Sequence, residues 1–207
     1  MRMCHTPSCP RVARPGWNCA WPARIGGAVL AAVLGLAWSC AAASTPTDYQ
    51  VKAVFLFNFA QFVEWPSAAF TNETSPIIIG ILGEDPFGSI LDETVKGEAV
   101  RGRHIVVKRL ALEDDPKACH ILFISRSEKD RVNALLEGLK HAPVLTVGEV
   151  DTFCERGGMI NFVRQDQNIR LEANRAGAED AGLKISSRLL TLARLVKTEP
   201  SKARTQP

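Results

Sequence analysis

Apolar residues recur at spacings of three and four from Val51 to Val63, a stretch that holds four of the nine phenylalanines of the chain. This spacing predicts an amphipathic helix that buries most of its surface. Thr45 with Pro46 supplies an N-cap and a first helical residue, while Trp65-Pro66 ends the helix because proline cannot continue it. The predicted helix has about 19 residues. Its polar residues form only a narrow stripe, at Gln50, Asn58, Gln61 and Glu64, and they argue against a membrane span.

Short apolar runs with the character of buried strands alternate with helical patterns along the next part of the chain. The predicted strands are residues 77–82, 104–109, 120–125 and 143–147, and the predicted helices are residues 85–95 and 127–139. This alternation is typical of a mostly parallel sheet with both faces covered. We therefore predict an α/β domain of three layers over residues 44–197, with a mixed sheet of about six strands.

The pattern changes toward the C-terminus. Residues 159–163 and 169–173 flank a polar turn and predict an antiparallel hairpin on the same sheet. A final helix is predicted to place four apolar residues on one face, and residues 198–207 are predicted to be a disordered tail. The apolar face consists of Ile185, Leu189, Leu192 and Val196.

The first 43 residues differ from the rest in charge. They contain four arginines, no acidic residue, an apolar run from Ile25 to Trp38 and small residues up to Ala43. These features predict a cleaved secretory signal peptide over residues 1–43, and hence a periplasmic protein. A retained anchor is an alternative, although the run is shorter than the roughly 20 apolar residues of a membrane span. Lipidation at Cys40 and a translation start after Met1 are further alternatives.

The charge of the chain depends on that segment. Of the 25 Lys and Arg, four lie in the segment, whereas none of the 22 Asp and Glu does, which leaves the remainder at about −1. Nucleic-acid binding therefore has no support from composition, and no nucleic-acid partner is expected. Two cysteines, Cys119 and Cys154, remain outside the segment. In an oxidising compartment they either pair or stay free, and the sequence leaves both possibilities open.

Catalytic and cofactor motifs are missing from the sequence. His104, His120 and His141 are not spaced like metal ligands, and the chain has no P-loop, no G-x-S-x-G and no G-x-G-x-x-G motif. No cofactor is expected, and an enzyme is the minority hypothesis. Residues 80–88 (GILGEDPFG) follow a strand and open a helix, where backbone N–H groups could receive an anion. A tight turn capped by Asp85 is the simpler interpretation.

One polar set near the C-terminus suggests a ligand site. Alternation places three polar residues on one face of the second hairpin strand, and two serines can cap the last helix beside an arginine. Such a set could hold an anionic metabolite, whereas a surface ion pair and an ordinary cap are the alternative. The candidate residues are Arg170, Glu172, Asn174, Ser186, Ser187 and Arg188.

Six sequence blocks resemble the YfiR family in content and order. They are VKAVFLFNFAQFVEWP, GILGEDPFG, CHILFIS, PVLTVGE, GGMINF and GLKISSRLLTLARLV. The resemblance implies a periplasmic, non-enzymatic regulator that binds the periplasmic sensor domain of an inner-membrane diguanylate cyclase and represses synthesis of cyclic-di-GMP. It also implies a homodimer and a second partner, an outer-membrane lipoprotein of the OmpA-like type. The family also has disulfides, but Cys119 and Cys154 do not reproduce its two-bridge pattern.

Aromatic residues of the first helix are candidates for the partner surface. Phe57 and Trp65 are chosen because aromatic side chains are enriched in interface cores. Both could equally belong to the core. A small-ligand receptor is the rival hypothesis for the whole protein, and the two roles can coexist, because a ligand that prefers one conformation shifts partner binding.

Overall fold

We describe the protein from a computed structural model, which defines residues 47–197 except 112 and 167. The predicted signal peptide and tail lie outside these residues, as do Thr45 and Pro46. Helix α1 (Asp48–Phe62) confirms the predicted helix but is shorter. Its N-cap is Thr47, which forms a capping box with Gln50.

The end of α1 also differs from the prediction. Residues Val63–Glu64 form strand β1, which pairs antiparallel with β9 (Lys184–Ile185). The chain therefore leaves the helix before Trp65-Pro66. Pairing between segments far apart in the sequence decides where this helix ends.

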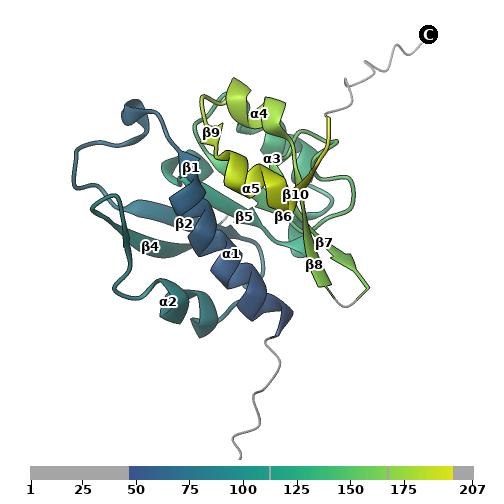
Figure 1. Cartoon of the computed structure of the whole chain (residues 1–207), viewed down its shortest axis with the longest axis horizontal. Coiled ribbons are helices and arrows are strands. Elements are labelled where there is room, and N and C mark those ends of the chain that lie inside the picture. The colour runs from purple at the N-terminus through teal and green to yellow at the C-terminus, as the bar shows by residue number, and fades with distance from the viewer. Residues whose placement is uncertain (1–46, 112, 167, 198–207) are drawn as a thin grey trace, which may run out of the picture. The chain divides into compact units, whose positions relative to one another are not determined.

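An eight-stranded sheet forms the centre of the fold (Figure 1). Strand β8 runs antiparallel to β7, β10 runs parallel to β8, and β3 runs antiparallel to β4. The other neighbouring pairs are parallel, which confirms the mixed, mostly parallel sheet and the C-terminal hairpin. The order across the sheet is β10 (Ala193–Leu195), β8 (Asn168–Ala173), β7 (Ile160–Gln165), β6 (Leu145–Gly148), β5 (Ile121–Ile124), β2 (Ile77–Leu82), β4 (Arg103–Leu110) and β3 (Ala99–Val100).

Two strands more than expected are present because the outermost strands are short. Strands β3 and β10 contain two and three residues, too few for an alternating pattern to be recognised. Both lie at the edges of the sheet, where short strands limit pairing with other chains.

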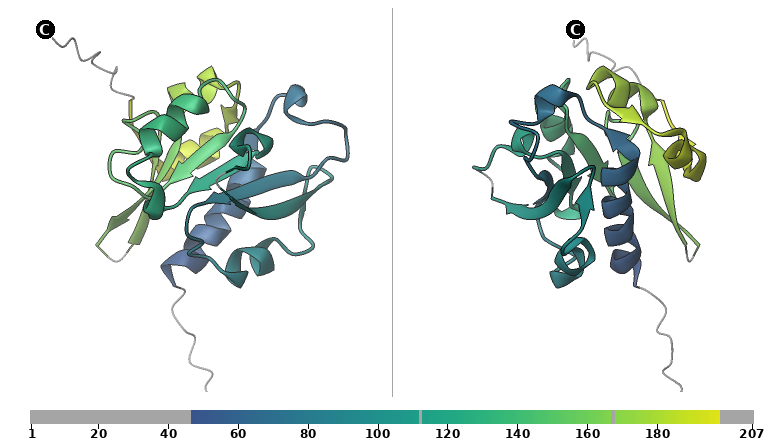
Figure 2. Two further views of the ribbon diagram at one scale, coloured as in Figure 1. Left: turned by 180° about the vertical axis from the view of Figure 1, so that it is seen from behind. Right: turned by 60° about the vertical axis from the view of Figure 1, so that its left-hand side comes forward.

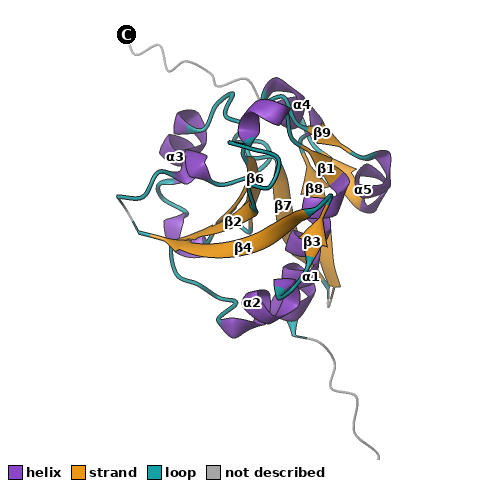
Figure 3. Cartoon of the chain, turned by 90° about the vertical axis from the view of Figure 1, so that its left-hand side faces the viewer, coloured by secondary structure: helices purple, strands orange, loops and turns teal. Residues whose placement is uncertain are grey.

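Helices cover both faces of the sheet and make three layers, as predicted (Figures 1 and 3). One cluster of buried residues joins α1, α2 (Ser89–Val95), α5 (Ser187–Leu192) and the sheet, with Leu56, Phe59 and Leu91 fully buried. A second cluster lies under α3 (Val132–Gly138) on the opposite face. Seen from behind, α3 lies in front of the sheet and α1 behind it (Figure 2). Because both faces are buried, β5 is apolar at all four positions.

Two predicted helices begin later than expected. Residue Ser89 is the first residue of α2, because the carboxylate of Asp85 accepts the N–H groups of Phe87 and Gly88 and forms a turn before the helix. The predicted helix 127–139 is a 3₁₀ turn (Arg126–Glu128) followed by α3. Asp85 therefore caps a turn, as the simpler interpretation held.

The prediction of one long final helix is wrong. Helix α4 (Arg175–Asp180) follows the hairpin, and α5 is only six residues long before the chain continues as β10 beside β8. Leu189 is buried as expected, but the side chain of Leu192 is 62% exposed. Strand pairing with β8 has overridden the helical pattern in this segment.

Candidate functional site

Loops that follow three parallel strands meet at one end of the sheet. The chain runs from β2 to β4 on one side and then returns to β5 on the other side of β2. Such a reversal leaves a crevice outside the carboxyl ends of the strands, where ligands bind in open α/β sheets. The crevice is a property of the strand order, and no single motif encodes it.

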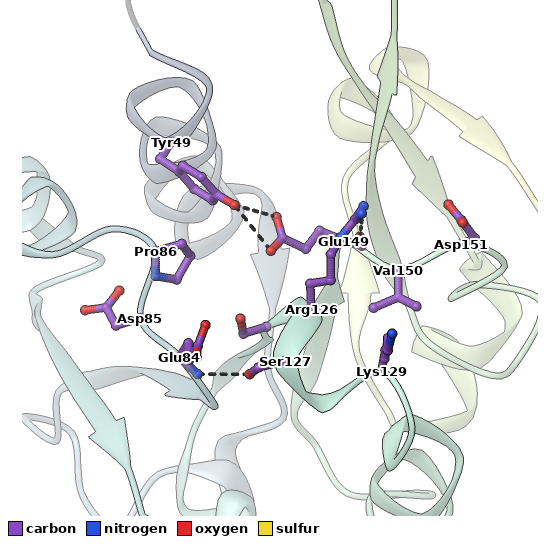
Figure 4. A pocket seen from close by; sticks show the side chains of 11 residues that line it. Tyr49, Glu84, Asp85, Pro86, Arg126, Ser127, Lys129, Glu149, Val150 and Asp151 are labelled. Atoms are coloured by element: carbon purple, nitrogen blue, oxygen red, sulfur yellow. Dashed lines mark hydrogen bonds between the residues drawn. The ribbon is translucent and has the colours of Figure 1, made fainter.

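A pocket of about 660 Å³ lies at this crevice (Figure 4). Its walls come from residues 84–86 after β2, residues 125–127 and Lys129 after β5, and residues 149–151 after β6, with Tyr49 contributed by α1. Its volume falls within the range of roughly 300–1,000 Å³ found for small-molecule sites. This pocket is our candidate functional site.

A buried ion pair joins α1 to the pocket. The Lys52 ammonium donates to the Glu149 carboxylate at 2.6 Å, and both side chains are below 10% exposure. The same ammonium lies 4.3 Å from the centre of the Tyr49 ring, a distance suited to a cation–π contact. Glu149 is thus neutralised inside the protein and is not free to bind a cation.

Tyr49 faces the same carboxylate across the pocket. Its hydroxyl donates to the two oxygens of Glu149 at 3.5 and 3.4 Å. Burial and the negative charge of Glu149 raise the pKa of Tyr49, whereas the Arg126 guanidinium acts in the opposite direction. The tyrosine therefore stays protonated and serves as a donor.

A second ion-pair network fixes the wall after β2. Arg109 donates to Asp85 at 2.9 Å and to Asp92 of α2 at 2.6 Å. The hydrogen bond from Arg109 holds the pKa of the Asp92 carboxyl below its usual range. Asp85 is consequently engaged by the turn and by Arg109, and it supports the wall.

Five other polar residues of the pocket keep binding capacity. Ser125 is 4% exposed and caps the following turn without a side-chain hydrogen bond. Arg126 is exposed and donates one hydrogen bond to the Glu149 carbonyl at 3.2 Å. The remaining groups are the exposed side chains of Glu84, Lys129 and Asp151.

Two residues of the predicted anion site are buried and hydrogen-bonded within the protein. Glu172 is buried, where it accepts from Asn161 and pairs with Arg194. Asn174 is fully buried and caps α4 through Gly177. Residues of this set do not line the pocket described above.

The other members of that set also lie apart from the pocket. Ser186 caps α5 by accepting from Leu189, and Ser187 is the first residue of that helix. Arg170 is exposed on β8, and the Arg188 guanidinium lies 6.0 Å from the centre of the Phe62 ring. Glu172 is buried because the end of β8 is covered on both faces, and Asn174 follows β8 as the N-cap of α4.

The two predicted interface aromatics have different environments. Trp65 donates its indole N–H to the His120 carbonyl at 3.1 Å and packs against the core, so it anchors the loop after α1. Phe57 is half-buried and also contacts the core. Val54, three residues earlier on α1, is 50% exposed.

His120 has a structural role. Its Nδ1 accepts the Ile78 N–H at 3.1 Å, and its ring stacks on Phe70 with 4.5 Å between ring centres. It does not line the pocket.

The two cysteines are buried and free, so the structure does not contain the disulfide considered from the sequence. The Sγ atom of Cys119 lies against Gly80 of β2, whereas the carbonyl of Cys154 accepts from Asn174, just after β8. Strands β5, β6 and β7 separate β2 from β8. At about 4.8 Å per strand, this separation exceeds the reach of a disulfide.

Two further structural findings concern the residues that the structure describes. Among them, no helix has the length and apolar character needed to cross a membrane. The same residues contain no cluster of three or more His, Cys, Asp or Glu side chains suited to a metal ion.

The sequence does contain a partial signal for the pocket. Each predicted strand that contributes a wall is followed at once by polar residues, in GILGED, FISRS and LTVGE. Polar residues directly after buried parallel strands collect at one edge of the sheet. The strand order decides which of these loops become neighbours, and that order is not encoded in any one segment.

Comparison with known proteins gives one result. A family model described as YfiR/HmsC-like matches residues 49–194. This range covers α1 from its second residue and almost all of the sheet, and it includes every residue that lines the pocket. A search of curated proteins finds no match.

Proposed function

Since this chain belongs to the YfiR/HmsC-like family, a family of regulators of diguanylate cyclase signalling, we propose that it represses cyclic-di-GMP synthesis. In this proposal it binds the periplasmic sensor domain of an inner-membrane diguanylate cyclase and catalyses no reaction itself. The observation that carries the proposal is the match over residues 49–194, which spans nearly the whole predicted domain.

The proposed location is the periplasm, in agreement with a family that acts there. Basic residues, an apolar run and small residues over positions 1–43 support export through a cleaved signal peptide. The protein acts as a homodimer, and an outer-membrane lipoprotein of the OmpA-like type competes with the cyclase for it. The homodimer and the lipoprotein partner both follow from the family resemblance.

The outer stripe of α1, which we define as Val54 and Phe57, is the proposed cyclase-binding surface. Val54 is 50% exposed and Phe57 is half-buried. Residues three apart lie on the same side of a helix, so the two apolar side chains lie on one side of α1. Trp65 is not included, because its indole is bound to the His120 carbonyl.

Cyclic-di-GMP levels in living cells test the function whichever cyclase is the partner. Deletion of the gene is expected to raise the nucleotide, and the complete gene is expected to lower it again. A version without residues 1–43 is expected to have no effect, because the protein then stays in the cytoplasm. An unchanged nucleotide level after deletion contradicts repression.

A charge placed on the stripe tests the surface. Val54→Asp is expected to abolish repression at a normal periplasmic amount of protein, because a desolvated charge in an apolar interface is costly. Leu195→Asp is the matched control, since Leu195 is 59% exposed and belongs to β10, outside the stripe. Equal repression by both variants contradicts this surface, while the function itself is judged by the deletion.

A further inference from the structure

We propose that the pocket at the carboxyl ends of β2, β5 and β6 binds a short peptide of two or three residues with free termini. The site and this ligand class do not depend on the cyclase partner. The argument rests on the charges that remain unpaired, the size of the pocket and one buried hydroxyl group.

The pocket has two positive and two negative side chains that form no ion pair among the described residues, and they come from three loops. Glu149 is paired with Lys52, and Asp85 shares the Arg109 guanidinium with Asp92. Of the other charged groups, Arg126 and Lys129 come from the loop after β5, Glu84 comes from the loop after β2, and Asp151 comes from the loop after β6. Figure 4 shows Glu84 on one side of the pocket and Arg126, Lys129 and Asp151 on the other. A ligand with an ammonium group at one end and a carboxylate at the other matches this arrangement.

The same charges disfavour ligands of one sign. A polyphosphate or a dicarboxylate would meet Glu84 and Asp151 without a compensating positive group of its own. A simple cation would meet Arg126 and Lys129. Leaving a charge near an unpaired like charge raises the free energy of the complex, so a zwitterion is favoured.

The size of the pocket indicates more than one amino-acid residue. Its volume of about 660 Å³ exceeds what a single free amino acid fills, and its charged walls belong to loops that follow different strands. Because the charged side chains of the pocket lie apart, the two charged termini of the ligand must also lie apart. A peptide of two or three residues spans the pocket and places a side chain beside the Tyr49 ring, Pro86 and Val150.

Ser125 supplies the hydrogen-bonding capacity that a peptide bond needs. The residue lines the pocket, is 4% exposed and forms no capping bond with its hydroxyl. An amide group of a bound peptide can donate to this hydroxyl or accept from it.

The first experiment measures thermal stabilisation of the purified protein by defined peptides. The probes are twenty tripeptides of the form Ala-X-Ala, in which X is each common amino acid, and the corresponding free amino acids. At least one tripeptide is expected to raise Tm, and to do so more than its free central amino acid at equal concentration. The best tripeptide is then tested by calorimetry in N-acetylated and in C-amidated form, and each blocked form is expected to bind at least tenfold more weakly.

Paired variants test the site. Arg126→Gln and Glu84→Gln are each expected to raise Kd for the best tripeptide at least tenfold. Arg131→Gln and Glu93→Gln are the matched controls, because these exposed residues do not line the pocket. The controls are expected to leave Kd unchanged. Unfolding of every variant without peptide is measured to exclude loss of fold as the cause.

Three results would overturn the proposal. The first is that none of the tripeptides changes Tm. The second is that blocking either terminus leaves Kd unchanged, since the charges would then not recognise the ligand. The third is that the pocket variants bind as tightly as the controls, which would locate peptide binding elsewhere on the protein.

Discussion

Lys52 and Glu149 form a buried ion pair at 2.6 Å that connects the helix at the start of the domain with the loop after β6. Lys52 lies on α1 two residues before Val54, and Glu149 lies in the wall of the pocket. The proposed partner surface and the pocket thus share one element. A ligand that changes the environment of Glu149 would act on α1 directly, which is the kind of link that allosteric coupling requires.

Removal of the lysine from this pair is expected to destabilise the protein strongly. Lys52→Met leaves the Glu149 carboxylate buried without its cation, and breaking a buried pair in this way costs about 3–5 kcal/mol. The free energy of unfolding is measured by urea denaturation. The double variant Lys52→Met/Glu149→Leu is expected to recover most of the loss, because no uncompensated charge remains.

An exposed pair provides the comparison for that experiment. Arg101 lies 3.3 Å from Glu64, and both side chains are 56% exposed. Arg101→Met is expected to change stability by less than about 1 kcal/mol, as is typical of surface pairs. A similarly small change in the free energy of unfolding of Lys52→Met would contradict a stabilising role for the buried pair.

Most of the fold could be predicted from the sequence because its central strands are continuous apolar runs. Residues 77–82 coincide with β2, and the hairpin of β7 and β8 was also predicted. The errors concern segments where distant partners decide the structure. Pairing of β1 with β9 shortens α1, and pairing of β10 with β8 ends α5. Local periodicity cannot reveal either contact.

The site was less predictable than the fold. Lys52 follows an apolar residue in a helix rich in phenylalanine, and its partner Glu149 lies 97 positions later. From the sequence alone, a lysine is expected to lie on the solvent-exposed side of its helix. The burial of Lys52 could therefore not be predicted without knowledge of its partner. The polar set from Arg170 to Arg188 looked convergent in the sequence, but burial of Glu172 and Asn174 gives these residues other partners.

Protein stability is expected to fall in mildly acidic solution because of His120. Burial lowers the pKa of His120 in the folded protein, and the nearby charge of Arg103 lowers it further. Below about pH 6.5 the unfolded chain therefore binds a proton that the folded protein does not bind. Stability is fully present above that pH and is lost as pH falls toward the folded pKa, by at most about 1.4 kcal/mol per pH unit from this group.

Urea denaturation at pH 7.5 and pH 5.5 measures this effect. His120→Gln is expected to reduce the difference in unfolding free energy between the two pH values. His104→Gln is the control, because His104 is exposed, and it is expected to keep the difference of the unaltered protein. The same pH dependence in both variants would exclude His120 as the responsible group.

A methyl group at Gly148 is expected to disrupt the packing of the loop after β6. A Cβ atom there would lie 2.5 Å from the ring of Phe153, which is fully buried. Gly148→Ala is therefore expected to lower the free energy of unfolding by about 1–3 kcal/mol through overpacking. A Cβ atom at Gly138 would have no atom within 4 Å. Because Gly138 is the last residue of α3, Gly138→Ala is expected to change the free energy of unfolding by less than about 1 kcal/mol. Equal effects of the two substitutions on the urea midpoint would contradict the close contact with Phe153.

The thiols of the exported protein are expected to be protected rather than redox-active. Burial raises the pKa of Cys119 to about 11 and that of Cys154 to about 12, so both are protonated near neutral pH, and the thiolate is the reactive form. A thiol reagent such as dithionitrobenzoate should therefore react slowly with the folded protein and at once with two groups in denaturant.

Chemical reduction tests whether the two cysteines are free or joined in a disulfide. Dithiothreitol is expected to leave Tm unchanged, because the thiols are already free and lie on different parts of the sheet. A disulfide between Cys119 and Cys154 would close a long loop and contribute about 2–4 kcal/mol. A marked fall in Tm on reduction, with fewer than two reactive groups in denaturant beforehand, would therefore contradict the free thiols. In that case the segments around Gly80 and Asn174 would have to approach each other, which would require a different arrangement of β2 and β8.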